Sequence, residues 1–111
     1  MNNRTQYDQL ELENIFANDF NTHHFIELAQ IYLDANDLNR AVKVCEIGLK
    51  THSTNLDARY MLAKLYLLTN QLSKSEQFLS KSLYQNLISN KMLKLFIEIR
   101  DSLNRSPHET K

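Results

Sequence analysis

The chain of 111 residues has very little glycine, proline and cysteine, and it has no tryptophan. A single glycine and a single proline argue against a sheet protein, because hairpin turns and bulges rely on these residues. The only cysteine, Cys45, has no partner for an internal disulfide, so nothing in the sequence indicates an oxidising compartment. No apolar run approaches the ~20 residues that cross a bilayer, and the N-terminus lacks the features of a secretory signal. We therefore expect a cytoplasmic protein without a membrane segment.

The sequence also lacks the residue groupings of common reaction centres. One glycine cannot build a glycine-rich phosphate loop. No two histidines stand three or four residues apart, the spacing at which two imidazoles on a helix can share a metal. Cys45 falls on the apolar side of a predicted helix, and the basic residues are dispersed rather than clustered with stacking aromatics. We expect no enzyme activity, no cofactor and no metal site, and we regard nucleic acid as a poor candidate for a partner.

What the chain does contain is an internal repeat. Residues 28–33 read Leu-Ala-Gln-Ile-Tyr-Leu, and residues 62–67, which lie 34 places later, read Leu-Ala-Lys-Leu-Tyr-Leu. The same offset relates Asn36 to Asn70, where we expect tight breaks between helices. A fixed period of this length is typical of stacked helix pairs, in which each unit buries its apolar face only against its neighbours. Together with the abundance of good helix formers, this predicts an all-α protein.

Apolar residues recur at helical spacing in separate segments. We expect helices over about residues 5–17, 22–35, 39–51, 56–69, 73–85 and 89–104. The first of these does not align with the repeat, so we interpret residues 1–21 as an N-terminal cap. Residues 22–55 and 56–89 then form two repeats, and residues 90–104 form a C-terminal capping helix. Residues 105–111, which contain Pro107, are predicted to be a flexible tail.

Charge is distributed unevenly along the chain, although the net charge is zero. Residues 1–37 contain one basic and seven acidic residues, whereas residues 38–111 contain twelve basic and six acidic residues. Two interpretations are open. The asymmetry can be ordinary surface charge, or it can drive head-to-tail attraction between copies or the binding of an acidic partner by the basic part.

The repeated residues resemble the tetratricopeptide repeat, a helix-turn-helix of the same period. The resemblance in the first unit rests on Phe25, Leu28, Ala29, Tyr32, Ala41, Cys45 and Gly48. In the second unit it rests on Tyr60, Leu62, Ala63, Tyr66, Ser75, Leu79 and Ser82. A third unit starting at Asn90 departs from the pattern, because Ile97 replaces a small residue and Arg100 replaces the tyrosine. The resemblance covers about residues 22–104 and implies a short right-handed helical-repeat stack of about six helices.

The resemblance further implies that the first helices of the units line a concave groove. The predicted groove residues are Ile26, Gln30, Leu33, Tyr60, Lys64, Leu67, Lys91 and Lys94, with Asp34 and Asp57 beside them. We predict a protein-interaction module, an adaptor, scaffold or chaperone-like protein, that holds a peptide or helix of a protein partner. The lysines would select an acidic partner.

Two other interpretations are open. One is a structural unit that assembles head-to-tail through its ends into homo-oligomers. The other is a regulatory domain of a larger protein. A groove that clamps the C-terminal carboxylate of a chaperone, known in one subfamily, is not expected. Ile26 and Gln30 occupy the places where that clamp begins.

Overall fold

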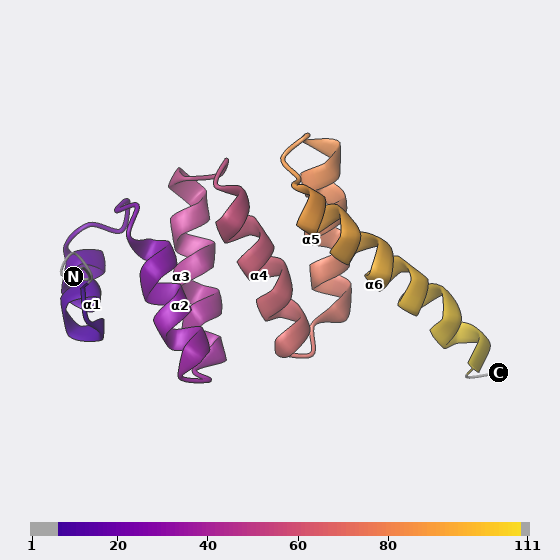
Figure 1. Cartoon of the computed structure of the whole chain (residues 1–111), viewed down its shortest axis with the longest axis horizontal. Helices are drawn as coiled ribbons and strands as arrows, with labels where there is room; N and C mark the ends of the chain where they lie inside the picture. The colour runs from indigo at the N-terminus through magenta and orange to yellow at the C-terminus, as the bar shows by residue number, and fades with distance from the viewer. Residues whose placement is uncertain (1–6, 110–111) are drawn as a thin grey trace.

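The computed structural model describes the backbone of residues 7–109 and the side chains of residues 7–104. Six α-helices and no strand occupy this part of the chain, which confirms the all-α prediction. They are α1 (Gln9–Asn18), α2 (Phe25–Asp34), α3 (Leu38–Thr51), α4 (Leu56–Leu68), α5 (Leu72–Tyr84) and α6 (Asn90–Glu109). The helices follow one another along the long axis of a molecule of 53 × 28 × 27 Å, with α1 and α6 at opposite ends (Figure 1).

The helices pack as two pairs between two single helices. α2 packs against α3 and α4 packs against α5, and the contact of α3 with α4 joins the two pairs. At the ends, α1 packs against α2, and α6 packs against α5 and touches α4. Each helix therefore contacts its neighbours in sequence, which is the arrangement that the repeat period predicts.

Small side chains allow the paired helices to approach closely. Ala29 of α2, Ala41 of α3 and Ala63 of α4 are fully buried. Ser75 of α5 is also fully buried, and its hydroxyl donates a hydrogen bond of 2.8 Å to the carbonyl of Ala63 across the second pair. A larger side chain at these places would hold the backbones apart, because the protein interior between the helices is close-packed.

Three asparagines end helices in the left-handed backbone region. Asn36, Asn70 and Asn86 follow α2, α4 and α5, with φ angles of 61°, 62° and 61°. Asparagine enters this region more readily than most residues. In each turn the residue after the asparagine donates its amide to a carbonyl five residues earlier, as Gln71 does to Tyr66 at 2.7 Å. The breaks predicted at Asn36 and Asn70 are confirmed.

The first two helices begin later than the sequence predicted. α1 begins at Gln9, because Asp8 and Glu11 form a capping box in which each side chain accepts the other's backbone amide, at 2.8 and 2.9 Å. Residues 5 and 6 of the predicted helix lie outside the described residues. α2 begins at Phe25 rather than near residue 22, since the Thr22 hydroxyl accepts the amide of His24 in a turn before the helix.

The last helix is longer than the sequence predicted. α6 continues to Glu109, so residues 105–109 belong to a helix and not to the predicted tail. Pro107 lies in the final turn of α6. Proline has no amide donor there, but the helix continues to Glu109. The prediction was wrong because it treated one proline near a helix end as a stop.

Candidate binding groove

A cavity of about 360 Å³ lies between α2, α4 and the start of α6. Its lining residues are Gln30, Leu33, Asp57, Tyr60, Met61, Lys64 and Lys91. Five of the eight predicted groove residues are therefore brought together, with Asp57 beside them. In α4, Tyr60, Met61 and Lys64 follow Asp57 by three, four and seven positions, which places these side chains on one side of the helix. Met61 was not among the predicted groove residues, because an apolar residue at this position of α4 is equally typical of the core.

Tyr60 is the centre of this cavity. Its half-buried ring packs against the core cluster formed by α4, α5 and α6, which fixes its position. The ammonium groups of Lys64 and Lys91 each lie 5.3 Å from the centroid of the ring. Both lysines are exposed, and Asp57 is the only acidic residue among the described residues that line the cavity. An aromatic surface flanked by two cations is suited to an acidic group next to an apolar one.

Three predicted groove residues lie outside this cavity. Ile26 and Leu67 are half-buried, and each packs against one of the two core clusters. Lys94 is exposed on α6, one turn beyond Lys91. First helices of this kind carry apolar residues on two neighbouring faces, and sequence spacing alone does not tell the groove face from the packing face.

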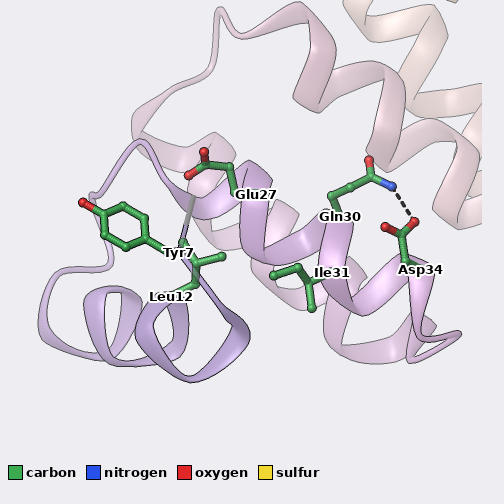
Figure 2. A pocket seen from close by; sticks show the side chains of 6 residues that line it. All are labelled: Tyr7, Leu12, Glu27, Gln30, Ile31 and Asp34. Atoms are coloured by element: carbon green, nitrogen blue, oxygen red, sulfur yellow. Dashed lines mark hydrogen bonds between the residues drawn. The ribbon is translucent and has the colours of Figure 1, made fainter. Parts of the chain in front are cut away.

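A second cavity, of about 330 Å³, continues the concave surface toward the N-terminal end (Figure 2). Its lining residues are Tyr7, Leu12, Glu27, Gln30, Ile31 and Asp34. Gln30 lines both cavities, and its side-chain amide donates a hydrogen bond of 2.8 Å to Asp34. The charged side chains that line this second cavity, Glu27 and Asp34, are both acidic, whereas two lysines line the first cavity. The concave surface therefore changes from acidic to basic along its length.

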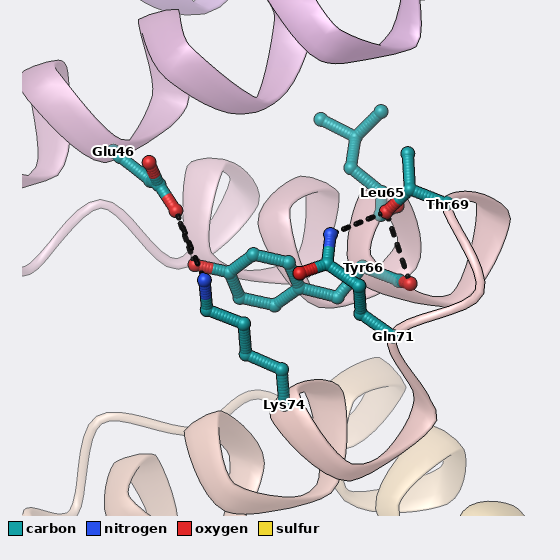
Figure 3. A network of polar contacts seen from close by, with 6 residues as sticks. All are labelled: Glu46, Leu65, Tyr66, Thr69, Gln71 and Lys74. Atoms are coloured by element: carbon teal, nitrogen blue, oxygen red, sulfur yellow. Dashed lines mark hydrogen bonds and ion pairs between the residues drawn. The ribbon is translucent and has the colours of Figure 1, made fainter.

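A polar contact repeated between the units holds the first helices in place. Tyr66 of α4 donates a hydrogen bond of 2.7 Å to Glu46 of α3, and Lys74 of α5 lies 5.1 Å from the centroid of the tyrosine ring (Figure 3). Lys74 is also 4.0 Å from the Glu46 carboxylate. Burial, followed by the hydrogen bond to Glu46, raises the pKa of Tyr66, so the phenol remains a donor at neutral pH.

The same contact occurs one unit earlier. Tyr32 of α2 donates a hydrogen bond of 2.5 Å to Glu13 of α1, and the Arg40 guanidinium lies 5.7 Å from the ring centroid. Tyr32 and Arg40 stand one repeat period before Tyr66 and Lys74. The hydrogen bond from Tyr32 lowers the pKa of Glu13. Both units thus contain a glutamate–tyrosine–cation arrangement.

α6 carries a charged variant of this contact. Arg100 stands one repeat period after Tyr66, and its guanidinium lies 3.7 Å from the Glu76 carboxylate of α5. The arginine that breaks the sequence pattern therefore joins α6 to α5 through an ion pair, although Glu76 stands four positions before Ser80, the place equivalent to Glu46. In its position along the chain, α6 follows α5 as the first helix α4 follows α3.

Among the described residues, the candidate nucleophile is buried and the metal-ligating residue types are dispersed. Cys45 is fully buried in the core, and burial raises the pKa of its thiol to about 12. Within residues 7–104, no three His, Cys, Asp or Glu side chains gather in a way that could hold a metal ion. Nor does any helix in that range have the length and apolarity needed to span a membrane.

Comparison with known proteins identifies one family. The family model of the tetratricopeptide repeat matches residues 32–87, which is half of the chain and includes α3, α4 and α5. The matched segment contains the Tyr66–Glu46 contact and the Tyr60 and Lys64 side chains of the larger cavity. No curated protein and no solved structure matches the chain.

Proposed function

Because the chain belongs to the tetratricopeptide repeat family, we propose that it is a protein-interaction module that holds a segment of another protein in its concave groove. The observation that supports this most strongly is the cavity around Tyr60. It gathers five residues that the family resemblance implies for a binding groove. We propose binding and not catalysis, in a cytoplasmic setting where the buried thiol of Cys45 stays reduced.

The lining of the cavity defines the chemistry of the ligand. Leu33, Met61 and the ring of Tyr60 offer apolar contact, and Lys64 and Lys91 offer two cations beside that ring. The matching ligand is a peptide or helix that places an acidic side chain next to an apolar one. Aromatic anchors at the centre of an interface contribute most of the binding energy, while flanking charges set orientation and association rate.

Capture from native lysate tests the proposal. The baits are the intact chain and a Tyr60→Ala/Lys64→Glu variant. A matched control carries Lys81→Glu and Tyr84→Ala on α5, where both side chains are exposed and outside the groove cavities. We expect a protein that the intact chain and the control retain and the groove variant loses. Equal retention by all three baits would contradict the groove as the binding site.

A further inference from the structure

α1 has the packing of a second helix rather than of an unrelated cap. Glu13 accepts a hydrogen bond from Tyr32 as Glu46 of α3 does from Tyr66. One position earlier, Leu12 is 2% exposed, and the residue before Glu46 is the fully buried Cys45. α1 therefore aligns with α3 at an offset one position shorter than the repeat period. α1 packs on α2 as α3 packs on α4 and α5 packs on α6.

The described stack consequently begins with half a unit, because residues 7–109 contain no first helix that pairs with α1. The place of such a helix can be located by comparison with the next unit. Met61 and Leu65 are 9% and 0% exposed in the core cluster that they share with α2. The residues 34 places earlier, Glu27 and Ile31, line the cavity of about 330 Å³ beside Leu12 of α1 (Figure 2). We call this cavity the helix slot.

α6 has the complementary defect. It is a first helix, and no second helix follows it within the described residues. Leu93 and Ile97 stand one repeat period after Arg59 and Ala63, which are 7% and 0% exposed inside the second pair. On α6, Leu93 and Ile97 are 37% and 59% exposed. The face that a second helix would cover is therefore open and apolar.

We propose that α6 of one copy occupies the helix slot of a second copy. The Leu93–Ile97 face of α6 then packs against α1 of the neighbour, so that two half units form one complete repeat across the junction. α1 and α6 lie at opposite ends of the long axis, so the contact cannot close within one chain. It is head-to-tail, and it can continue from copy to copy.

Charge favours a second copy as the occupant. Residues 7–37, which form the slot and its surroundings, contain seven acidic residues and no lysine or arginine. Residues 38–111 contain twelve basic and six acidic residues, and Lys94 lies exposed on α6 between Leu93 and Ile97. An acidic slot attracts Lys94 and repels a second acidic slot, which favours a head-to-tail orientation.

The size of Ile97 sets the strength expected of the junction. Ile97 occupies the place of Ala63 and Ala29, which let the helices within a copy approach closely. The bulkier side chain holds the junction helices farther apart, so the contact between copies is weaker than the contacts within one. Assembly should therefore depend on concentration, and it should weaken as salt shortens the Debye length from ~10 Å at 0.1 M to ~3 Å at 1 M.

Two variants that each disable one end give the sharpest test. Ile97→Asp alters the exposed face of α6, and Glu27→Lys/Asp34→Lys reverses the charge of the slot. Leu83→Asp is the matched control, because Leu83 is a 45% exposed leucine on α5 outside both surfaces. Far-UV circular dichroism verifies that each variant keeps its helices. Lys94→Glu, a change of one exposed side chain, tests the same surface without touching its apolar part.

Sedimentation velocity over a concentration series provides the readout. We expect the intact chain and Leu83→Asp to form species larger than a monomer, and each end variant alone to stay monomeric. Mixed one to one, Ile97→Asp and the slot variant should form dimers and stop there, because only one functional pair of ends remains. We expect Lys94→Glu to shift assembly to higher concentration.

Three outcomes would overturn the proposal: an intact chain that stays monomeric at high concentration and low salt, end variants that assemble like the intact chain, or a mixture that gives no dimer. A monomer that instead binds a basic amphipathic helix of another protein would assign the slot to that partner. The test is independent of groove binding, because Tyr60→Ala/Lys64→Glu leaves both ends intact and should assemble like the intact chain.

Discussion

In the first repeat unit, Phe25 of α2 packs against Gly48 of α3, and in the second unit the residues 34 places later are Arg59 and Ser82. Phe25 is fully buried, with its ring in the space that a side chain at residue 48 would need. Arg59 is 7% exposed, and its guanidinium donates hydrogen bonds to the Ser82 hydroxyl at 2.7 Å and to the Ser53 carbonyl at 2.6 Å.

The difference shows which properties of a repeat position are constrained. One unit fills the space between its helices with an aromatic ring, and the other fills it with a cation that is hydrogen-bonded on both sides. A buried polar group costs little when it is hydrogen-bonded and a great deal when it is not. The filling of the space is therefore common to both units, whereas the residue type and the hydrogen bonding differ.

The largest expected effect comes from Gly48→Ala in the first unit. An added Cβ would lie 2.1 Å from Phe25 Cδ2 and 2.2 Å from Cγ, so the ring or the helix must move. Overpacking of this kind costs ~1–3 kcal/mol or more, which exceeds the ~1 kcal/mol of helix propensity that alanine gains over glycine. We expect the free energy of unfolding to fall by about 2 kcal/mol, measured by urea denaturation.

Adding Phe25→Leu to Gly48→Ala tests the stated cause. The smaller side chain should relieve the overlap, so the double variant should lose less stability than the sum of the two single variants. Additive losses would show that the alanine acts elsewhere. Ser80→Ala, at an exposed position of α5, measures the effect of helix propensity alone.

Ser82→Ala should produce the next largest effect, in the second unit. It removes the hydroxyl that accepts from the buried guanidinium of Arg59, and hydrogen bonds to charged groups contribute ~1.5–3 kcal/mol. The Ser53 carbonyl remains as a partner, so we expect a loss of about 1.5 kcal/mol in urea denaturation. A variant as stable as the parent would mean that water replaces the hydroxyl at no cost.

Tyr66→Phe and Tyr32→Phe compare the contact between units at two places. Each removes one hydroxyl that donates to a glutamate, on Glu46 and Glu13 respectively. We expect Tyr66→Phe to lose about 1 kcal/mol of stability and Tyr32→Phe to lose less, because Glu13 belongs to α1 at the end of the described stack. A larger loss for Tyr32→Phe than for Tyr66→Phe, measured side by side by urea denaturation, would show that the Tyr32–Glu13 contact is the stronger one.

The smallest effect concerns pH. The hydrogen bond from Tyr32 lowers the pKa of Glu13 below the ordinary value of 4.5. The ionised carboxylate therefore stabilises the fold above that value, and the stabilisation is lost as the pH falls through the lowered pKa. Melting temperature should drop more between neutral and acidic pH in the parent than in Tyr32→Phe. Identical pH profiles would contradict a role for this hydrogen bond.

The fold was predictable because the repeated residues are the core itself. The segments 28–33 and 62–67 include Leu28, Ala29, Tyr32 and their equivalents, whose burial fixes the helix pairs. The role of α1 was not predictable, because its register differs from the repeat by a single residue. The contact of Glu13 with Tyr32 and the burial of Leu12 reveal that register.

The candidate site was predictable in part. The resemblance to the tetratricopeptide repeat implies Gln30, Leu33, Tyr60, Lys64 and Lys91 as groove residues, and they do line one cavity. The second cavity had no signal in the sequence, because it arises where α1 has no partner helix within the described residues. Such an opening depends on which helices the stack contains, and local residue patterns do not report it.

The affinity of a captured partner depends on Tyr60 if the groove around this residue is the binding site. Calorimetric titration of that partner into the intact chain, Tyr60→Ala and the control Tyr84→Ala gives three dissociation constants. We predict that Tyr60→Ala weakens binding about tenfold, roughly 1.4 kcal/mol, and that Tyr84→Ala leaves it unchanged. Unchanged affinity for Tyr60→Ala, with its helices intact by circular dichroism, would show that the partner does not bind in the groove around Tyr60.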